Sequence, residues 1–143
     1  MRRPSDTLVV DAAILVSAAL GRSGPVLFDV AGKATLVTTD RAAHEAARRI
    51  ELGMQRPDLL LALSAILRAI SVVAIARLAH AIASAEDTLR DAVHSRNGSI
   101  ADAHILALAW EANADIWSHD RDFAGVGVAS WSTINLVDAL GDD

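Results

Sequence analysis

The chain has 143 residues and is 52% hydrophobic, which excludes disorder over most of its length and predicts a single domain across residues 1–143. Cysteine is absent, which excludes disulfides and cysteine-bound zinc or iron–sulfur centres and favours a reducing, cytoplasmic location. The formal net charge of −5 argues against binding of nucleic acid through a basic surface alone.

Apolar runs and breaker residues predict strands that alternate with helices. In chain order, the first half predicts a strand at 7–11, helices at 12–20 and 25–31, a strand at 34–38, and helices at 39–52 and 58–69. The second half predicts a strand at 71–75, helices at 78–96 and 99–113, strands at 114–118 and 125–131, and a final helix at 132–140. This alternation is typical of an α/β fold, a three-layer α/β/α sandwich whose central, mainly parallel sheet has four to five strands.

The most apolar part of the chain, residues 59–85, raises the question of a membrane span. Arg68, Arg77 and His80 interrupt it, and its longest uncharged stretches have 9 and 8 residues. A spanning helix needs about 18–20 residues, so we expect no membrane association. Part of this region is instead expected to form a dimer face or a docking groove for a partner helix.

Three acidic residues follow predicted strands. Asp11 ends the first strand, and Asp120 and Asp122 come shortly after the fourth. Ligands of an open parallel sheet bind beyond the carboxyl ends of its strands, so these acids are candidates for one site. Taken alone, Asp120 and Asp122 are more typical of an ordinary turn after a strand.

Two further acids lie on predicted helices. Asp102 is in the first turn of a helix that is apolar around most of its circumference, where a carboxylate is costly unless it is paired or bound to a metal. Ser99 and Asp102 also match a capping box, and the two roles are compatible. Glu45 lies within a helix, where the ordinary alternative is an exposed side chain paired with Arg49, worth only about 0.2–0.5 kcal/mol.

The acids become informative as a set. Carboxylates that converge on one place raise each other's pKa unless a cation lies among them. Ligand sets made only of oxygen suit Mg²⁺ or Mn²⁺ rather than zinc. Two divalent ions add four positive charges and would change the formal charge from −5 to −1, so the acidic balance does not exclude a polyanionic substrate. A zinc-protease motif that starts at His44 and Glu45 is set aside, because Arg48 stands where the second His is needed.

The acidic residues and the sequence around them, in this order along the chain, resemble the PIN-domain nucleases, and among them the VapC-like toxins of bacterial toxin–antitoxin pairs. The matching stretches are residues 8–18, Glu45, residues 102–109 and residues 114–123, of which the last two are the most specific. The resemblance implies a PIN-like fold and a Mg²⁺- or Mn²⁺-dependent endoribonuclease that cleaves RNA phosphodiester bonds by metal-activated water. It also implies an antitoxin protein as a partner, and a homodimer is expected.

The resemblance also implies the site residues. The catalytic acids would be Asp11, Glu45, Asp102 and Asp120, and the metal ligands would be Asp11, Asp102, Asp120 and Asp122. Arg121, between two of these acids, is the first candidate for binding the RNA backbone, and the others are Arg48, Arg49 and Arg96. His104 and His119 flank site acids and are expected to be surface residues or indirect contacts of the ligands.

The chain departs from the family pattern directly after the first acid. The family usually has Thr-Asn or a similar polar pair there, and this chain has Ala12 and Ala13. Without these polar groups Asp11 would be less well oriented, because neighbouring hydrogen bonds fix metal ligands. The alternative function is therefore a catalytically weakened PIN-like module that binds RNA or a protein partner without cleaving. Ser118 stands where a Thr or Ser is usual before the Asp-x-Asp motif.

Overall fold

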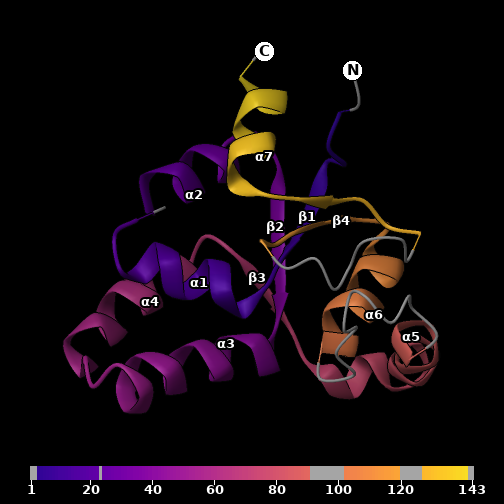
Figure 1. Cartoon of the computed structure of the whole chain (residues 1–143), viewed down its shortest axis with the longest axis horizontal. Helices are drawn as coiled ribbons and strands as arrows, with labels where there is room; N and C mark the ends of the chain where they lie inside the picture. Colours follow the sequence, from indigo (N-terminus) through magenta and orange to yellow (C-terminus); the bar gives the residue numbers. More distant parts are fainter. Residues whose placement is uncertain (1–2, 23, 91–101, 120–126, 142–143) are drawn as a thin grey trace.

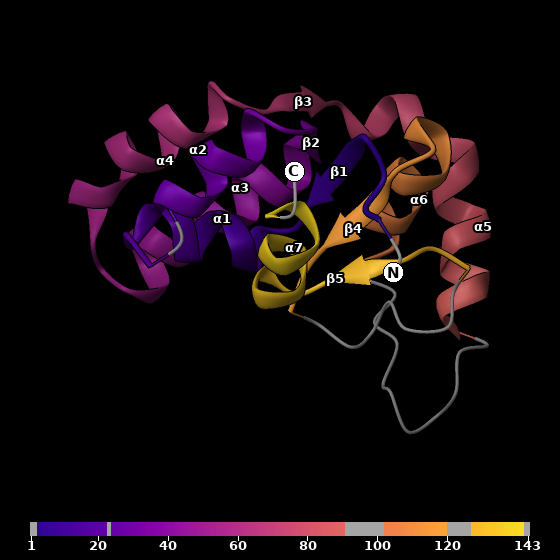
Figure 2. The same cartoon turned by 90° about the horizontal axis from the view of Figure 1, so that it is seen from above.

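The computed structural model describes residues 3–22, 24–90, 102–119 and 127–141. Within these ranges, five strands form one sheet in the order β3-β2-β1-β4-β5, and every neighbouring pair is parallel (Figures 1 and 2). The strands are β1 (Thr7–Val10), β2 (Thr35–Thr39), β3 (Ser71–Val73), β4 (Asp115–Trp117) and β5 (Ser130–Trp131). The predicted parallel sheet of four to five strands is therefore confirmed.

Helices cover both faces of the sheet, which is seen close to edge-on in Figure 1. One face carries α1 (Ala12–Ala19), α2 (Gly24–Ala31), α3 (Asp40–Arg48) and α4 (Leu60–Leu67), and the other carries α5 (Ala79–Arg90) and α6 (Ala103–Ala112). The last helix, α7 (Thr133–Leu140), packs against α2. Short helical turns join the longer elements at η1 (Arg49–Gly53), η2 (Pro57–Leu59) and η3 (Ile75–Leu78). These layers confirm the predicted α/β/α sandwich.

Strand β1 lies at the centre of the sheet, between β2 and β4. Leu8, Val9 and Val10 are fully buried, as expected for a strand that is covered on both faces. Later strands are added on both sides of β1, so the strand order reverses between β1 and β4. At such a point a crevice forms beyond the carboxyl ends of the strands. Asp11 is the first residue after β1 and therefore lies at this point.

Polar caps begin two helices directly after their strands. The Asp11 carboxylate accepts a hydrogen bond from the backbone N–H of Ile14 and caps α1. The Thr39 hydroxyl accepts from the backbone N–H of Ala42 and caps α3. These caps fix where strand ends and helix begins, which explains why both starts agree with the prediction to within one residue.

Helix α6 is the most deeply buried helix of the described residues. Each residue from 103 to 109 is at most 3% exposed, because α6 lies between α5 and strands β1 and β2. Its apolar circumference therefore reflects packing inside the fold. No helix in the described ranges is both long and apolar enough to cross a membrane.

Several boundaries differ from the prediction. The helix expected at 39–52 consists of α3 and the π-helical turn η1, in which the Met54 N–H donates to the Arg49 carbonyl oxygen at 2.8 Å. This wider turn ends at Gly53, a residue that is poor at continuing an α-helix. The helix expected at 99–113 begins at Ala103, and the one expected at 78–96 begins with η3 and is described only to Arg90. Strand β5 occupies the end of the expected range 125–131, part of which lies outside the described residues.

Candidate active site

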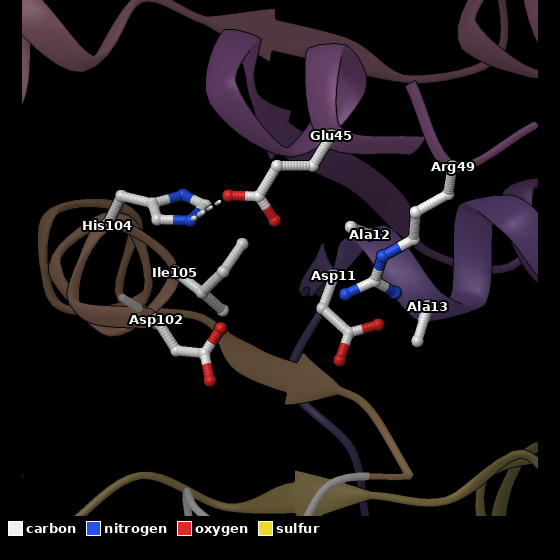
Figure 3. A pocket seen from close by; sticks show the side chains of 8 residues that line it. All are labelled: Asp11, Ala12, Ala13, Glu45, Arg49, Asp102, His104 and Ile105. Carbon is white, nitrogen blue, oxygen red and sulfur yellow. Dashed lines mark ion pairs between the residues drawn. The ribbon is translucent and has the colours of Figure 1, made fainter. Parts of the chain in front are cut away.

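A pocket opens beyond β1, between α1, the α3–η1 segment and the start of α6 (Figure 3). It brings together three acids that are far apart in the sequence: Asp11, Glu45 and Asp102. The remaining residues that line it are Ala12, Ala13, Arg49, His104 and Ile105. Asp120, Arg121 and Asp122, which were also predicted as site residues, lie outside the described residues, as does Arg96.

Asp11 is held at both carboxylate oxygens. It is 8% exposed, and its Oδ1 accepts from the backbone N–H of Ile14 at 3.0 Å. Its Oδ2 accepts from the hydroxyl of Ser118, the residue that follows β4. Two donors from different elements therefore orient Asp11, although Ala12 and Ala13 contribute no polar side chain.

Glu45 lies near the end of α3 and is one-third exposed. Its Oε1 lies 3.3 Å from Arg41 Nε, so its ion pair along the helix is with Arg41. The ordinary alternative for Glu45, an ion pair with Arg49, is therefore replaced by a pair with Arg41. Arg49 begins η1, and its guanidinium extends into the pocket beside Asp11 and Ala13 (Figure 3).

Asp102 immediately precedes α6 and is partly buried. Its side chain makes no cap hydrogen bond to the first turn of the helix. The expected position of Asp102 inside the first turn of the helix was wrong, because α6 begins one residue after it. Ser99, the other half of the capping box, lies outside the described residues, so that part of the hypothesis is untested.

His104 is 2% exposed, so the expectation of a surface histidine was wrong at this position, and the other expectation, an indirect contact of the ligands, stays a prediction. Its Nδ1 lies 2.7 Å from the hydroxyl oxygen of Thr39, and its Nε2 lies 3.9 Å from Glu45 Oε1. Burial lowers the pKa of His104 to about 4, with the nearby Glu45 carboxylate opposing that shift. The imidazole is therefore neutral at physiological pH, and its contact with Glu45 is a polar contact between a neutral ring and a carboxylate.

The donor set of the pocket suits a hard divalent cation. Asp11, Glu45 and Asp102 offer carboxylate oxygens, which Mg²⁺ and Mn²⁺ prefer. Within the described ranges, no three His, Asp or Glu side chains lie close enough together to form a ready-made metal cage. Mg²⁺ usually keeps several water ligands and takes only one or two carboxylates, so well-separated acids around a pocket fit a hydrated ion.

Two residues of the pocket were missed or ranked low from the sequence. Arg49 was placed below Arg121, although its spacing of four from Glu45 puts both on one helix face. The π-helical turn η1, which no sequence pattern predicted, begins at Arg49. Arg48, which the sequence made an equal candidate with Arg49 for binding RNA, is exposed and does not line the pocket. His104 stood only two residues from Asp102, and the buried helix around it was the signal that it lies in the core.

The fold and the acidic pocket define a small α/β domain with a carboxylate site at the edge of a parallel sheet. The sequence matches the family model described as the PIN domain over residues 9–140, so the chain belongs to the PIN-domain family. This confirms the resemblance to the family that was noted in the sequence. No curated protein sequence matches the chain significantly.

Solved structures of toxin–antitoxin systems share this fold. VapBC2 from Rickettsia felis, bound to promoter DNA, matches with a TM-score of 0.67 at 14% identity, over 88% of this chain and 98% of that one. A toxin–antitoxin complex from Klebsiella pneumoniae matches with a TM-score of 0.61 at 20% identity, over 88% of this chain and 97% of that one. VapC20 from Mycobacterium tuberculosis, a toxin that cleaves the sarcin–ricin loop, matches with a TM-score of 0.62 at 21% identity, over 85% and 96%. At these identities the similarity establishes the VapC-like fold.

Proposed function

We propose that the protein is a VapC-like toxin, an endoribonuclease that cleaves RNA phosphodiester bonds with Mg²⁺ or Mn²⁺. The observation that carries this proposal is the convergence of Asp11, Glu45 and Asp102, from three separate elements, on one pocket beyond the central strand. Membership of the PIN-domain family and the fold shared with VapC20 support it.

The acids would hold the cation and orient water. Asp11 and Asp102 would be ligands, together with Asp120 and Asp122. Glu45 would be a ligand or would orient the attacking water through the oxygen that faces the pocket. When bound, the cation would supply Lewis-acid stabilisation of the charge that develops on the scissile phosphate and would make water more acidic.

Arg49 would bind a phosphate of the RNA. Its side chain reaches the pocket beside Ala13, whose own side chain has no polar group, and a guanidinium binds phosphate oxygens in a bidentate manner. We expect Arg49→Ala to raise KM by about 10–100-fold, in line with about 1.5–3 kcal/mol for a hydrogen bond to a charged group. The dependence of affinity on salt should weaken by about one unit of slope.

Arg48→Ala is the matched control for this prediction, because Arg48 is its exposed neighbour outside the pocket. Its KM should stay within about twofold of wild type, since exposed charges contribute little. Steady-state kinetics on one RNA substrate at several salt concentrations measure both quantities. An equal rise in KM for the two variants would remove Arg49 from the site.

The alternative is a PIN-like module that binds RNA or protein without cleaving. The observation that favours it is Ala13, an exposed residue of the pocket that offers no polar group to a substrate. Incubation of total RNA with the purified chain separates the two functions. The nuclease should cleave RNA with Mg²⁺ or Mn²⁺ and stop when a chelator is added, whereas binding with no cleavage in either metal would favour the alternative.

An antitoxin protein is the proposed partner, in a cytoplasmic toxin–antitoxin pair. The structures from Rickettsia felis and Klebsiella pneumoniae are toxin–antitoxin systems with the same fold, which supports this. Leu61 on α4 is 82% exposed, and Leu52 and Met54, at the end of η1, are also exposed apolar side chains. Leu61 lies in the apolar region 59–85, part of which was predicted as a docking groove or a dimer face, and a homodimer remains part of the proposal.

A further inference from the structure

His104 is a buried polar side chain, and the metal-binding role proposed for the acids of the pocket does not explain its position. It projects from α6 toward α3. Its Nδ1 lies beside the hydroxyl of Thr39, the residue that caps α3. Its Nε2 faces Glu45, which lies within α3 (Figure 3). Within the described part of the chain, Nε2 is fully buried and has no hydrogen-bond partner. A buried polar group without a partner is energetically unfavourable. The nearest acceptor, Glu45, is therefore the candidate partner of His104 Nε2.

The hydrogen bonds of Thr39 indicate which ring nitrogen of His104 carries the proton. Thr39 Oγ1 already accepts the N–H of Ala42 at 2.9 Å. The side chain is fully buried, so its hydroxyl hydrogen needs an acceptor, and His104 Nδ1 at 2.7 Å is the one that the described residues offer. A neutral ring that accepts at Nδ1 carries its hydrogen on Nε2. That hydrogen is directed at Glu45.

Two donors flank the same oxygen of Glu45. Arg41 Nε lies 3.3 Å from Oε1 and His104 Nε2 lies 3.9 Å from it. The Arg41 side chain is half exposed, so its ion pair is weak and easily exchanged for water. The His104 ring is immobilised in the core by Thr39. The second oxygen of Glu45 is directed into the pocket, toward the side that holds Asp11 and Asp102 (Figure 3).

A separation of 3.9 Å is longer than a hydrogen bond. Contacts at catalytic sites are often long before the ligand binds and shorten in the complex. A small movement of the Glu45 carboxylate would bring Oε1 within reach of Nε2 and would give that buried N–H its partner. The ring itself needs no movement, because Thr39 already fixes its orientation.

We propose that His104 is a positioning residue for Glu45. When the pocket is occupied, the Nε2–H of His104 donates to Glu45 Oε1 and keeps the other oxygen of Glu45 directed at the cation or the water. The inference rests on the proposed function, since it takes Glu45 as a site acid. Thr39 then has two tasks: it caps α3 and it sets the tautomer of His104.

The first test requires neither metal nor activity. NMR of the ¹⁵N-labelled full chain identifies the protonated ring nitrogen from its coupling to the carbon-bound ring protons. We expect His104 to be the Nε2–H tautomer, and we expect Glu45→Gln to shift its Nε2 resonance while His44→Asn, a change at the exposed neighbour of Glu45, does not. The Nδ1–H tautomer, or an Nε2 resonance that ignores Glu45→Gln, would overturn the inference.

The second test uses two replacements that differ in reach. Gln can place an amide N–H near the position of Nε2, whereas Asn reaches only the position of Nδ1. We expect His104→Asn to lower kcat about 10–100-fold with KM nearly unchanged, and His104→Gln to restore most of kcat, in line with the usual effect of residues that orient metal ligands. Equal loss of kcat in two variants of similar Tm would overturn the inference.

The two tests also separate this inference from the proposed function. A wild-type chain that binds no Mg²⁺ or Mn²⁺ and cleaves no RNA would refute the nuclease. The tautomer of His104 and its response to Glu45→Gln would still be measurable, and they alone would then support or overturn the pairing of the two residues.

Discussion

Asp11→Asn is expected to lower RNA cleavage at least about 100-fold, because residues that merely orient metal ligands already contribute about 10–100-fold. Asp11 lies at the carboxyl end of the central strand, and Ser118 and the Ile14 N–H hold its two oxygens. The substitution removes the negative charge and retains a side chain of the same shape. Initial rates on one RNA substrate at saturating Mg²⁺ or Mn²⁺ measure the effect.

The same variant should remain folded, which makes the loss of activity interpretable. Asn caps helices as well as Asp, so its carbonyl oxygen can still accept the Ile14 N–H at the start of α1. Asp29→Asn is the matched control, because Asp29 is an exposed carboxylate on α2 with a loose ion pair to Lys33. Cleavage by Asp11→Asn at the rate of this control would exclude Asp11 from the site.

Trp117→Ala is expected to give the largest loss of stability, about 3–5 kcal/mol in the free energy of unfolding. Trp117 is completely buried at the end of β4, beside Val10 of β1. Its indole N–H also donates to the Thr133 hydroxyl at 3.0 Å and so ties the start of α7 to the sheet. Truncation would leave a cavity and remove that link at the same time. Urea unfolding measures the difference.

Trp110→Ala provides the matched comparison for this effect. Trp110 lies on α6 and is 36% exposed, so truncation removes less buried area and opens no enclosed cavity. We expect it to cost less than about half as much as Trp117→Ala, since large losses come from cavities in the core. A Trp117→Ala protein that unfolds at the same urea concentration as Trp110→Ala would contradict the assigned packing of β4.

Much of the fold was predictable because its signals are local. The short apolar run before Asp11 fits a strand covered on both faces, and the acid that ends the run fits the start of a helix. The same reasoning placed Thr39 at the start of α3. Strand β5 was predicted less well, because its two residues have no pattern of their own and, among the described residues, pair with β4 alone.

The candidate site was predictable where order along the chain determines position in space. Asp102 stood out as a carboxylate in the first turn of an apolar helix, and Asp11 follows from the rule that parallel strands gather their ends at one edge. Arg49 and His104 did not follow from it. The direction of Arg49 depends on a π-helical turn, and such turns leave no reliable trace in sequence. The contact between His104 and Glu45 depends on how α6 packs against α3, which is a property of the assembled layers.

The central claim is that the acidic pocket binds a divalent cation, and calorimetric titration of the full chain with Mg²⁺ and with Mn²⁺ tests it most directly. The wild-type chain and Asp102→Asn are titrated side by side, because Asp102 shares the pocket with Asp11 but makes no cap hydrogen bond to the first turn of α6. We predict binding to the wild-type chain and a loss of affinity of at least about tenfold in the variant, as for a ligand of the metal. Absence of binding in both proteins, or equal affinity in the two, would contradict the account.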